Sequence, residues 1–170
     1  MTDFARSFPP IAAPDARVLI LGSMPGQASL AAGEYYAHPR NAFWPIMAAL
    51  LGFAIDSPYA ARTAALKSAG IALWDVLASC ERPGSLDSAI DRESSAINDF
   101  VGFFRSRPEI RHVFFNGGAA ESIFCKHLPC AANLFGLTLA RLPSTSPAHA
   151  GLSREAKLDQ WRRVLEALHR

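Results

Sequence analysis

Long apolar runs are absent from this chain of 170 residues. The longest stretch, residues 46–51, falls far short of the ~20 residues that a transmembrane helix needs. Residues 1–14 include Asp3, Arg6 and Pro9 and hold no apolar run of signal-peptide length. We therefore expect a cytoplasmic protein without a membrane partner.

Cysteine is scarce, with only Cys80, Cys125 and Cys130. An odd number in a chain without an export signal indicates free thiols. His127 is the only other metal-ligand candidate near Cys125 and Cys130, whereas zinc and iron–sulfur sites normally use four ligands at tighter spacing. We therefore expect these two cysteines to be small buried hydrophobic residues, and we expect neither a metal nor a cofactor.

Neither sign of charge dominates, because 17 Lys and Arg oppose 15 Asp and Glu, for a net charge of +2 and a pI near 8.6. This balance is compatible with a nucleic-acid partner but does not require one. Arg154, Lys157, Arg162, Arg163 and Arg170 gather near the C-terminus. From the charge pattern alone, a solvated helix face is the favoured interpretation.

The composition is that of a folded domain. Half of the residues are apolar and 10% are aromatic, which argues against disorder. A typical domain has about 100–200 residues, so we predict a single domain over residues 1–170.

Strand-like and helix-like segments alternate along the sequence. The segments predicted as buried strands are 17–21, 71–77, 112–115 and 137–142. The predicted helices are 41–51, 59–68, 94–105, 119–128 and a last helix capped by Ser153, and a polar loop is predicted over 81–92. This alternation is typical of an α/β fold in which a parallel sheet, here of four strands, is covered by helices on both faces.

Ligand sites of parallel sheets lie beyond the carboxyl ends of the strands. That rule selects the loops 22–40, 116–118 and 143–151, which are rich in Gly, Pro, Ser and Asn. In the first loop, 22–26 reads Gly-Ser-Met-Pro-Gly and matches neither a Walker loop nor a dinucleotide fingerprint. Its glycines would let the backbone approach a ligand, although a plain turn explains them equally well.

The segment 35–44 concentrates aromatic rings beside Arg40 and Asn41, a combination that suits a flat heterocycle. We expect Phe43 and Trp44 to anchor a helix in the core. Tyr35 and Tyr36 precede that helix and are harder to explain as core residues.

Polar residues follow the later strands. Asn116 could read a base edge or form a turn, and the segment 143–149 could contact phosphate or cap a helix. Ser144 or Ser146 with His149 could also serve an esterase-like hydrolase, but no Gly-x-Ser-x-Gly elbow is present. Asp75 is either a carboxylate at the site or an ordinary residue at a strand end.

Taken together, the motifs 22–26, 36–44 and 142–147 resemble those of the uracil-DNA glycosylase superfamily. The similarity is greatest to its hypoxanthine-DNA glycosylase and mismatch-specific branches. It implies a three-layer α/β/α sandwich with a central four-stranded parallel sheet. It also implies a monofunctional glycosylase of base excision repair that flips a deaminated base, hypoxanthine or uracil, out of double-stranded DNA and hydrolyses its N-glycosidic bond.

Two positions depart from the family pattern. Met24 stands where the mismatch-specific branch has Asn in Gly-x-Asn-Pro-Gly, and a thioether can neither orient nor deprotonate water. The hypoxanthine branch lacks that residue too, and there Asn41 is the natural replacement. Ser144 stands where other branches have a catalytic His or Asn. A catalytically weak or inactive binder of damaged DNA is therefore an alternative.

The resemblance implies roles for individual residues of a protein that we expect to be monomeric. Asn41 would orient the attacking water, and Arg154 and Lys157 would add non-specific affinity for DNA. The base would contact Tyr36, which stacks on it, Asn116 at its edge, and Gly22, Ser23 and Met24. The DNA backbone would contact Pro25, Gly26, Ser144, Thr145, Ser146 and His149.

Overall fold

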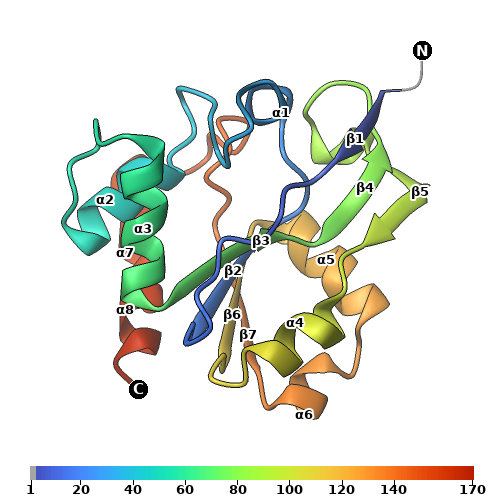
Figure 1. Cartoon of the computed structure of the whole chain (residues 1–170). Helices are drawn as coiled ribbons and strands as arrows, with labels where there is room; N and C mark the ends of the chain where they lie inside the picture. Colours follow the sequence, from blue (N-terminus) through green and yellow to red (C-terminus); the bar gives the residue numbers. More distant parts are fainter. Residues whose placement is uncertain (1–2) are drawn as a thin grey trace.

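A four-stranded parallel sheet forms the centre of the computed structural model, which describes residues 3–170 (Figure 1). The strand order is β3–β2–β6–β7. The strands are β2 (Val18–Gly22), β3 (Ile71–Asp75), β6 (His112–Asn116) and β7 (Thr138–Leu142). In register, Leu21 lies beside both Trp74 and Phe115, so the carboxyl ends of the strands meet at one edge. The predicted parallel sheet is confirmed.

Helices cover both faces of this sheet, which makes the three-layer α/β/α arrangement that the resemblance implied (Figure 1). The helices on one face are α2 (Phe43–Leu51), α3 (Tyr59–Ala69), α7 (Arg154–Trp161) and α8 (Arg163–Leu168). Those on the other are α4 (Phe100–Ser106), α5 (Gly118–His127) and α6 (Ala131–Phe135).

The central strands are apolar throughout because both of their faces are buried. In β2, Val18 and Ile20 point to the layer of α2, α3, α7 and α8, whereas Leu19 and Leu21 point to the other layer. None of the four is exposed. Burying one such side chain contributes about 1.5–3 kcal/mol, so the two clusters of core residues hold the sheet in place.

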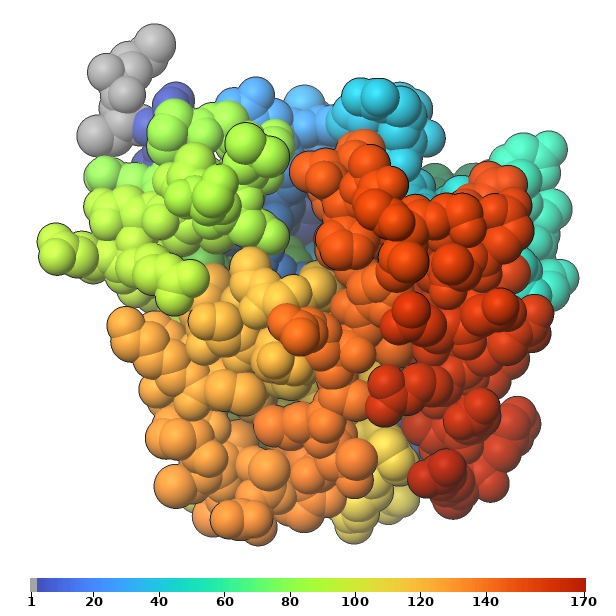
Figure 2. All heavy atoms as spheres, turned by 180° about the vertical axis from the view of Figure 1, so that it is seen from behind, coloured from blue at the N-terminus to red at the C-terminus, as the bar shows by residue number. Residues whose placement is uncertain are grey.

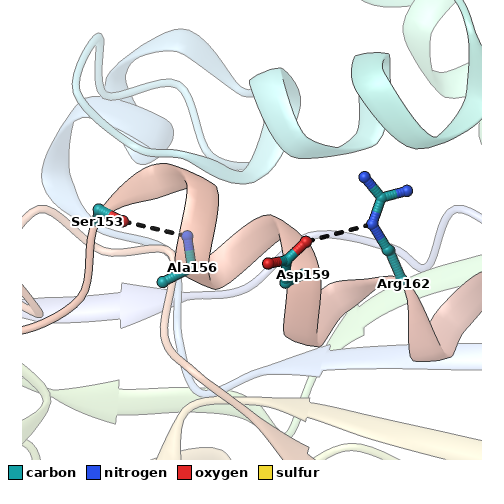
Figure 3. A network of polar contacts seen from close by, with 4 residues as sticks. All are labelled: Ser153, Ala156, Asp159 and Arg162. Atoms are coloured by element: carbon teal, nitrogen blue, oxygen red, sulfur yellow. Dashed lines mark hydrogen bonds and ion pairs between the residues drawn. The ribbon is translucent and has the colours of Figure 1, made fainter.

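Ser153 caps the last helical segment as predicted, since its hydroxyl accepts a hydrogen bond from the amide of Ala156 (Figure 3). The segment divides at Arg162 into α7 and α8. The ion pair between Asp159 on α7 and Arg162 just after it is exposed, so it contributes little to stability.

A second, antiparallel sheet with the order β1–β4–β5 was not predicted. Its strands are β1 (Phe4–Arg6), β4 (Leu77–Glu81) and β5 (Asp91–Ile97). The predicted strand 71–77 therefore ends at Asp75, and after Val76 the chain enters β4, a strand of the second sheet.

The predictions of a loop over 81–92 and a helix over 94–105 were wrong where β5 lies. The hydroxyls of Ser94 and Ser95 donate to the carbonyl of Asp91, and β5 is an edge strand paired with β4. A polar edge strand carries little apolar alternation, so its sequence does not reveal it. The helix begins only after Asp99, whose carboxylate accepts from the amide of Gly102.

Two short helices and two of the cysteines differ from what the sequence predicts. The short helices α1 (Gln27–Ala32) and η1 (Asp87–Ala89) lie in segments predicted as loops. All three cysteines are free, but Cys125 and Cys130 are exposed and not buried as expected.

Among the described residues, no helix combines the length and apolarity needed to cross a membrane. The single domain stays a prediction, and residues 1 and 2 of its span lie outside the described part.

Phe124 tests how the core holds the sheet. Its ring is fully buried on α5 and contacts the rings of Phe100 and Phe115. We expect Phe124→Ala to lower the free energy of unfolding by about 3–5 kcal/mol in urea titrations, because it leaves a cavity. Leu134→Ala, at a side chain that is 67% exposed on α6, should change it by less than about 0.5 kcal/mol. Equal losses for both variants would contradict this view of the core.

Candidate active site

A cavity of about 410 Å³ opens at the carboxyl edge of the parallel sheet, where the three predicted loops converge. Every residue predicted for the site lines it. Figure 2 shows blue atoms of the segment around residues 20–30 set back between the segment around residues 80–95 (yellow-green) and the segment around 145–150 (orange). The described residues contain no group of three His, Cys, Asp or Glu side chains that could hold a metal ion.

Tyr36 supplies an aromatic surface to the cavity. Its ring is stacked on Phe43, with centroids 4.2 Å apart and planes at 28°. Its φ of 55° is unusual for a residue with a side chain, and such strained backbone is concentrated at functional sites. Its hydroxyl is buried and has no hydrogen-bond partner among the described residues.

Tyr35 differs from its neighbour because it belongs mainly to the core. Its hydroxyl donates to the carbonyl of Pro9, and its carbonyl accepts from the indole of Trp44. Phe43 and Trp44 are buried as predicted. Core packing thus explains Tyr35, contrary to the expectation, and fixes the backbone beside Tyr36.

Asn41 lies at the start of α2 and borders the cavity. Its side-chain oxygen accepts a hydrogen bond from the amide of Phe43, at 2.9 Å. That bond fixes the orientation of the side-chain amide, while a second lone pair of the oxygen and both amide hydrogens stay available.

Asn116 joins the end of β6 to the loop after β7. Its side-chain nitrogen donates to the hydroxyl of Thr145, and its oxygen accepts from the amide of Thr145, both at 2.9 Å. Thr145 is only 1% exposed, so its hydroxyl serves the scaffold. The second amide hydrogen of Asn116 takes no part in these two bonds, and the residue lines the cavity.

Two serine hydroxyls of the loop after β7 accept hydrogen bonds from backbone amides of the same loop. Ser144 accepts from the amide of Ser146, and Ser146 accepts from the amide of Ala148, each at 3.2 Å. Within residues 3–170, neither hydroxyl is hydrogen-bonded to the ring of His149, and the esterase-like alternative is not favoured.

Lys157 also holds this loop, because its ammonium group donates to the carbonyl of His149 at 2.7 Å. The residue is only 5% exposed. The expectation was that Lys157 would add non-specific affinity for DNA. Its ammonium group is instead buried and bound within the protein, so it is not free to contact phosphate.

A segment that sequence reasoning missed closes one side of the cavity: Ser85, Leu86, Asp87 and Ser88. The buried guanidinium of Arg82 donates to the carbonyls of Pro25 and Gly84. The hydroxyl of Ser23 donates to Asp87 at 2.5 Å. These bonds tie the segment to the loop 22–26, and no local sequence signal indicates that pairing.

Asp75 ends β3 inside the cavity and is 3% exposed. A Cβ at Gly22 would lie 2.5 Å from its Oδ1 and 2.9 Å from the hydroxyl of Tyr36, so only glycine fits between them. Burial, and to a lesser degree the charge of Asp87, raise the pKa of Asp75, whereas the charge of Arg82 lowers it, and the net result is a pKa of about 7. The Oδ2 atom has no partner among the described residues.

A second cavity of about 460 Å³ adjoins the first and shares Asn41, Ser146 and His149 with it. The exposed side chains of Arg40 and Arg154 line it as well. The mouth of the candidate site therefore opens onto a basic groove.

The sequence profile of the uracil DNA glycosylase superfamily matches residues 9–169. The chain belongs to the uracil DNA glycosylase superfamily. All three motifs that carried the resemblance, 22–26, 36–44 and 142–147, lie within the matched span, and the expected fold and family are confirmed.

Individual relatives in the superfamily are similar over most of their length. A protein of Methanosarcina acetivorans named hypoxanthine DNA glycosylase is 34% identical over 160 residues, 94% of this chain and 96% of its own. One of Methanosarcina barkeri with the same name is 38% identical over 113 residues, 66% and 70% of the two chains. A solution NMR structure from M. acetivorans, described as a candidate uracil DNA glycosylase, superposes with a TM-score of 0.81 at 33% identity and covers 98% of this chain and 99% of that chain.

The buried carboxyl of Asp75 predicts an unusual dependence of stability on pH. Its pKa is near 7 in the folded protein and about 3.8 when exposed, so the folded state binds more protons between these values. The free energy of unfolding should therefore fall as pH rises from 4 to 7, by up to about 1.4 kcal/mol per pH unit.

Asp75→Asn removes this ionisation, so the variant should be more stable than the wild type at pH 8, with a difference that shrinks toward pH 4. Urea titrations at pH 4.5, 6 and 8 measure it. A difference that is constant across pH, or largest at pH 4.5, would contradict the raised pKa.

Proposed function

We propose that this protein is a monofunctional DNA glycosylase that hydrolyses the N-glycosidic bond of hypoxanthine flipped out of double-stranded DNA. The observation that carries the proposal is the convergence of Tyr36, Asn41 and Asn116 on one cavity beside a basic groove. The relatives named hypoxanthine DNA glycosylase support the choice of base. Uracil is the second candidate, supported by the description of the similar NMR structure.

The cavity suits a flat base. Its volume falls within the ~300–1,000 Å³ typical of small-ligand pockets. In the proposal the base stacks on Tyr36, whose ring is backed by Phe43, and its polar edge meets the second amide hydrogen of Asn116. Gly22, Ser23 and Met24 complete the contacts along the first loop.

Asn41 orients the attacking water in this proposal. The hydrogen bond from the amide of Phe43 already fixes the side-chain oxygen of Asn41. The second lone pair of this oxygen can therefore accept from a water without a further loss of side-chain rotational freedom. Glycosidic cleavage passes through an oxocarbenium-like state, which needs a placed nucleophile more than a strong base. Met24 is buried among core side chains and supplies no acceptor, so the role falls to Asn41.

The DNA backbone would follow the basic groove. Ser144 and Ser146 keep their hydroxyl hydrogens for phosphate, and His149, Arg40 and Arg154 are exposed beside them. Pro25 and Gly26 border the opposite side of the cavity. The buried Thr145 supports Asn116, so we no longer propose it as a phosphate ligand. The proposal includes a monomer that acts in the cytoplasm without a cofactor.

Asn41→Ala tests the proposal directly. We expect single-turnover base release from an inosine-containing duplex to fall more than tenfold, because the water loses its acceptor. Asn41→Asp keeps the oxygen that caps α2 and should retain more activity than the Ala variant. Circular dichroism checks that both variants fold. A loss of less than tenfold in Asn41→Ala would remove Asn41 from the catalytic role.

The basic groove predicts how DNA affinity depends on salt. The double variant Arg40→Gln/Arg154→Gln should bind duplex DNA more weakly and lower the slope of log affinity against log salt by about 1–2, since roughly 0.9 counterion is released per neutralised phosphate. Arg105→Gln/Lys126→Gln, which removes equal charge from α4 and α5, is the matched control. Equal slopes for the two double variants, measured by fluorescence anisotropy, would exclude the groove as the DNA path.

A further inference from the structure

Asp75 is a buried carboxyl that borders the cavity and has no assigned role in the proposed reaction. Its Oδ2 has no hydrogen-bond partner among the described residues. Leaving a buried polar atom unpaired is costly, so such an atom at a pocket wall indicates a group that a ligand completes. The ligand that Asp75 would meet therefore offers a complementary polar atom.

The position of Asp75 decides which part of a bound nucleotide it faces. Asn41, Ser146 and His149 border both the cavity and the basic groove, so they mark the mouth. Asp75 borders only the first cavity, and its carboxyl lies next to Gly22, as does the hydroxyl of Tyr36. A nucleotide whose phosphates lie in the groove would place its sugar near Asn41 and its base toward Asp75.

The surroundings of Asp75 favour its neutral form. Asp87 on η1 brings a second carboxylate, and Tyr35 and Tyr36 bring neutral phenols. Arg82, after β4, is the nearby cation, and its charge opposes the other effects by lowering the pKa of Asp75. Two of its guanidinium nitrogens donate to the carbonyls of Pro25 and Gly84, and Nη1 has no hydrogen-bond partner among the described residues. Burial is the largest effect and the resulting pKa of Asp75 is about 7, so a large share of the carboxyl groups carry a proton in neutral solution.

We propose that Asp75 is a catalytic residue whose neutral carboxyl donates its proton to an in-plane ring nitrogen, N3 or N7, of the flipped purine. This inference rests on the proposed function and adds the group that activates the leaving base. Hydrogen-bond donors aimed at developing negative charge lower the barrier of such reactions. This step suits hypoxanthine better than uracil, because N1 of uracil carries the sugar and N3 already carries a hydrogen, so uracil has no unprotonated ring nitrogen to accept the proton.

The proposed hydrolysis consumes one water molecule. The C1′–N9 bond breaks and its electron pair leaves with the base, while the Asp75 proton passes to the ring nitrogen, so the base departs neutral. The water held by Asn41 forms the C1′–O bond and releases one proton to solvent. The Asp75 carboxylate then regains a proton from solvent after the base leaves.

The pH profile of single-turnover base release from an inosine duplex tests the proposal, with Asp75→Asn, Asp75→Leu and the exposed-carboxyl control Asp159→Asn on α7. The wild-type rate and that of Asp159→Asn should fall up to tenfold per pH unit above about 7. Asp75→Asn keeps a donor that does not ionise, so its rate should stay level from pH 6 to 9. Asp75→Leu should lose more than tenfold at pH 6.

Other results would contradict either the role of Asp75 or the proposed function as a whole. A wild-type rate that rises with pH, together with an inactive Asp75→Asn, would make Asp75 a general base and overturn the proposal. Asp75→Leu that is folded and as fast as wild type would exclude any catalytic role. If Asp75→Leu fails to fold, the profile of the nearly isosteric Asp75→Asn decides alone. A folded wild type that releases no base at any pH contradicts the proposed function, and the role of Asp75 with it.

Discussion

The parallel pairing of four buried strands is the constraint on which the rest of this structure depends. Because β3, β2, β6 and β7 run the same way in register, the ends of three of them bring Asp75, Gly22 and Asn116 to one edge of the sheet. The absence of a side chain at Gly22 leaves room there for the carboxyl of Asp75 and the hydroxyl of Tyr36. Loops then complete the candidate site. They contribute Asn41, which we propose orients the water, and the hydroxyls of Ser144 and Ser146, which we propose contact phosphate.

The strands of the parallel sheet could be predicted from the sequence because both of their faces are buried. The segments 17–21, 112–115 and 137–142 are apolar because helices cover them on both sides, so their strands and the parallel sheet could be predicted. The candidate site followed from the rule that loops after such strands gather at one edge. Its specific chemistry depended on the motif 36–44, where Asn41 and Tyr36 stand at fixed spacing from the buried Phe43.

What could not be predicted depends on contacts between distant segments. The edge strand β5 has a polar sequence, so backbone pairing with β4 decides its structure. The segment 85–88 is held at the cavity by long-range hydrogen bonds of Arg82, Ser85 and Asp87. Tyr35 and Thr145 had the residue types of a binding site, but their hydroxyls serve core and scaffold.

The central claim is that the cavity receives a deaminated base from DNA. A panel of otherwise identical duplexes that carry inosine, uracil or an undamaged adenine at one position, scored for abasic sites after incubation with the folded protein, tests it most directly. The account predicts abasic sites at inosine, formed faster than at uracil, and none at adenine. Tight binding to the inosine duplex with no abasic product from any member of the panel would contradict it.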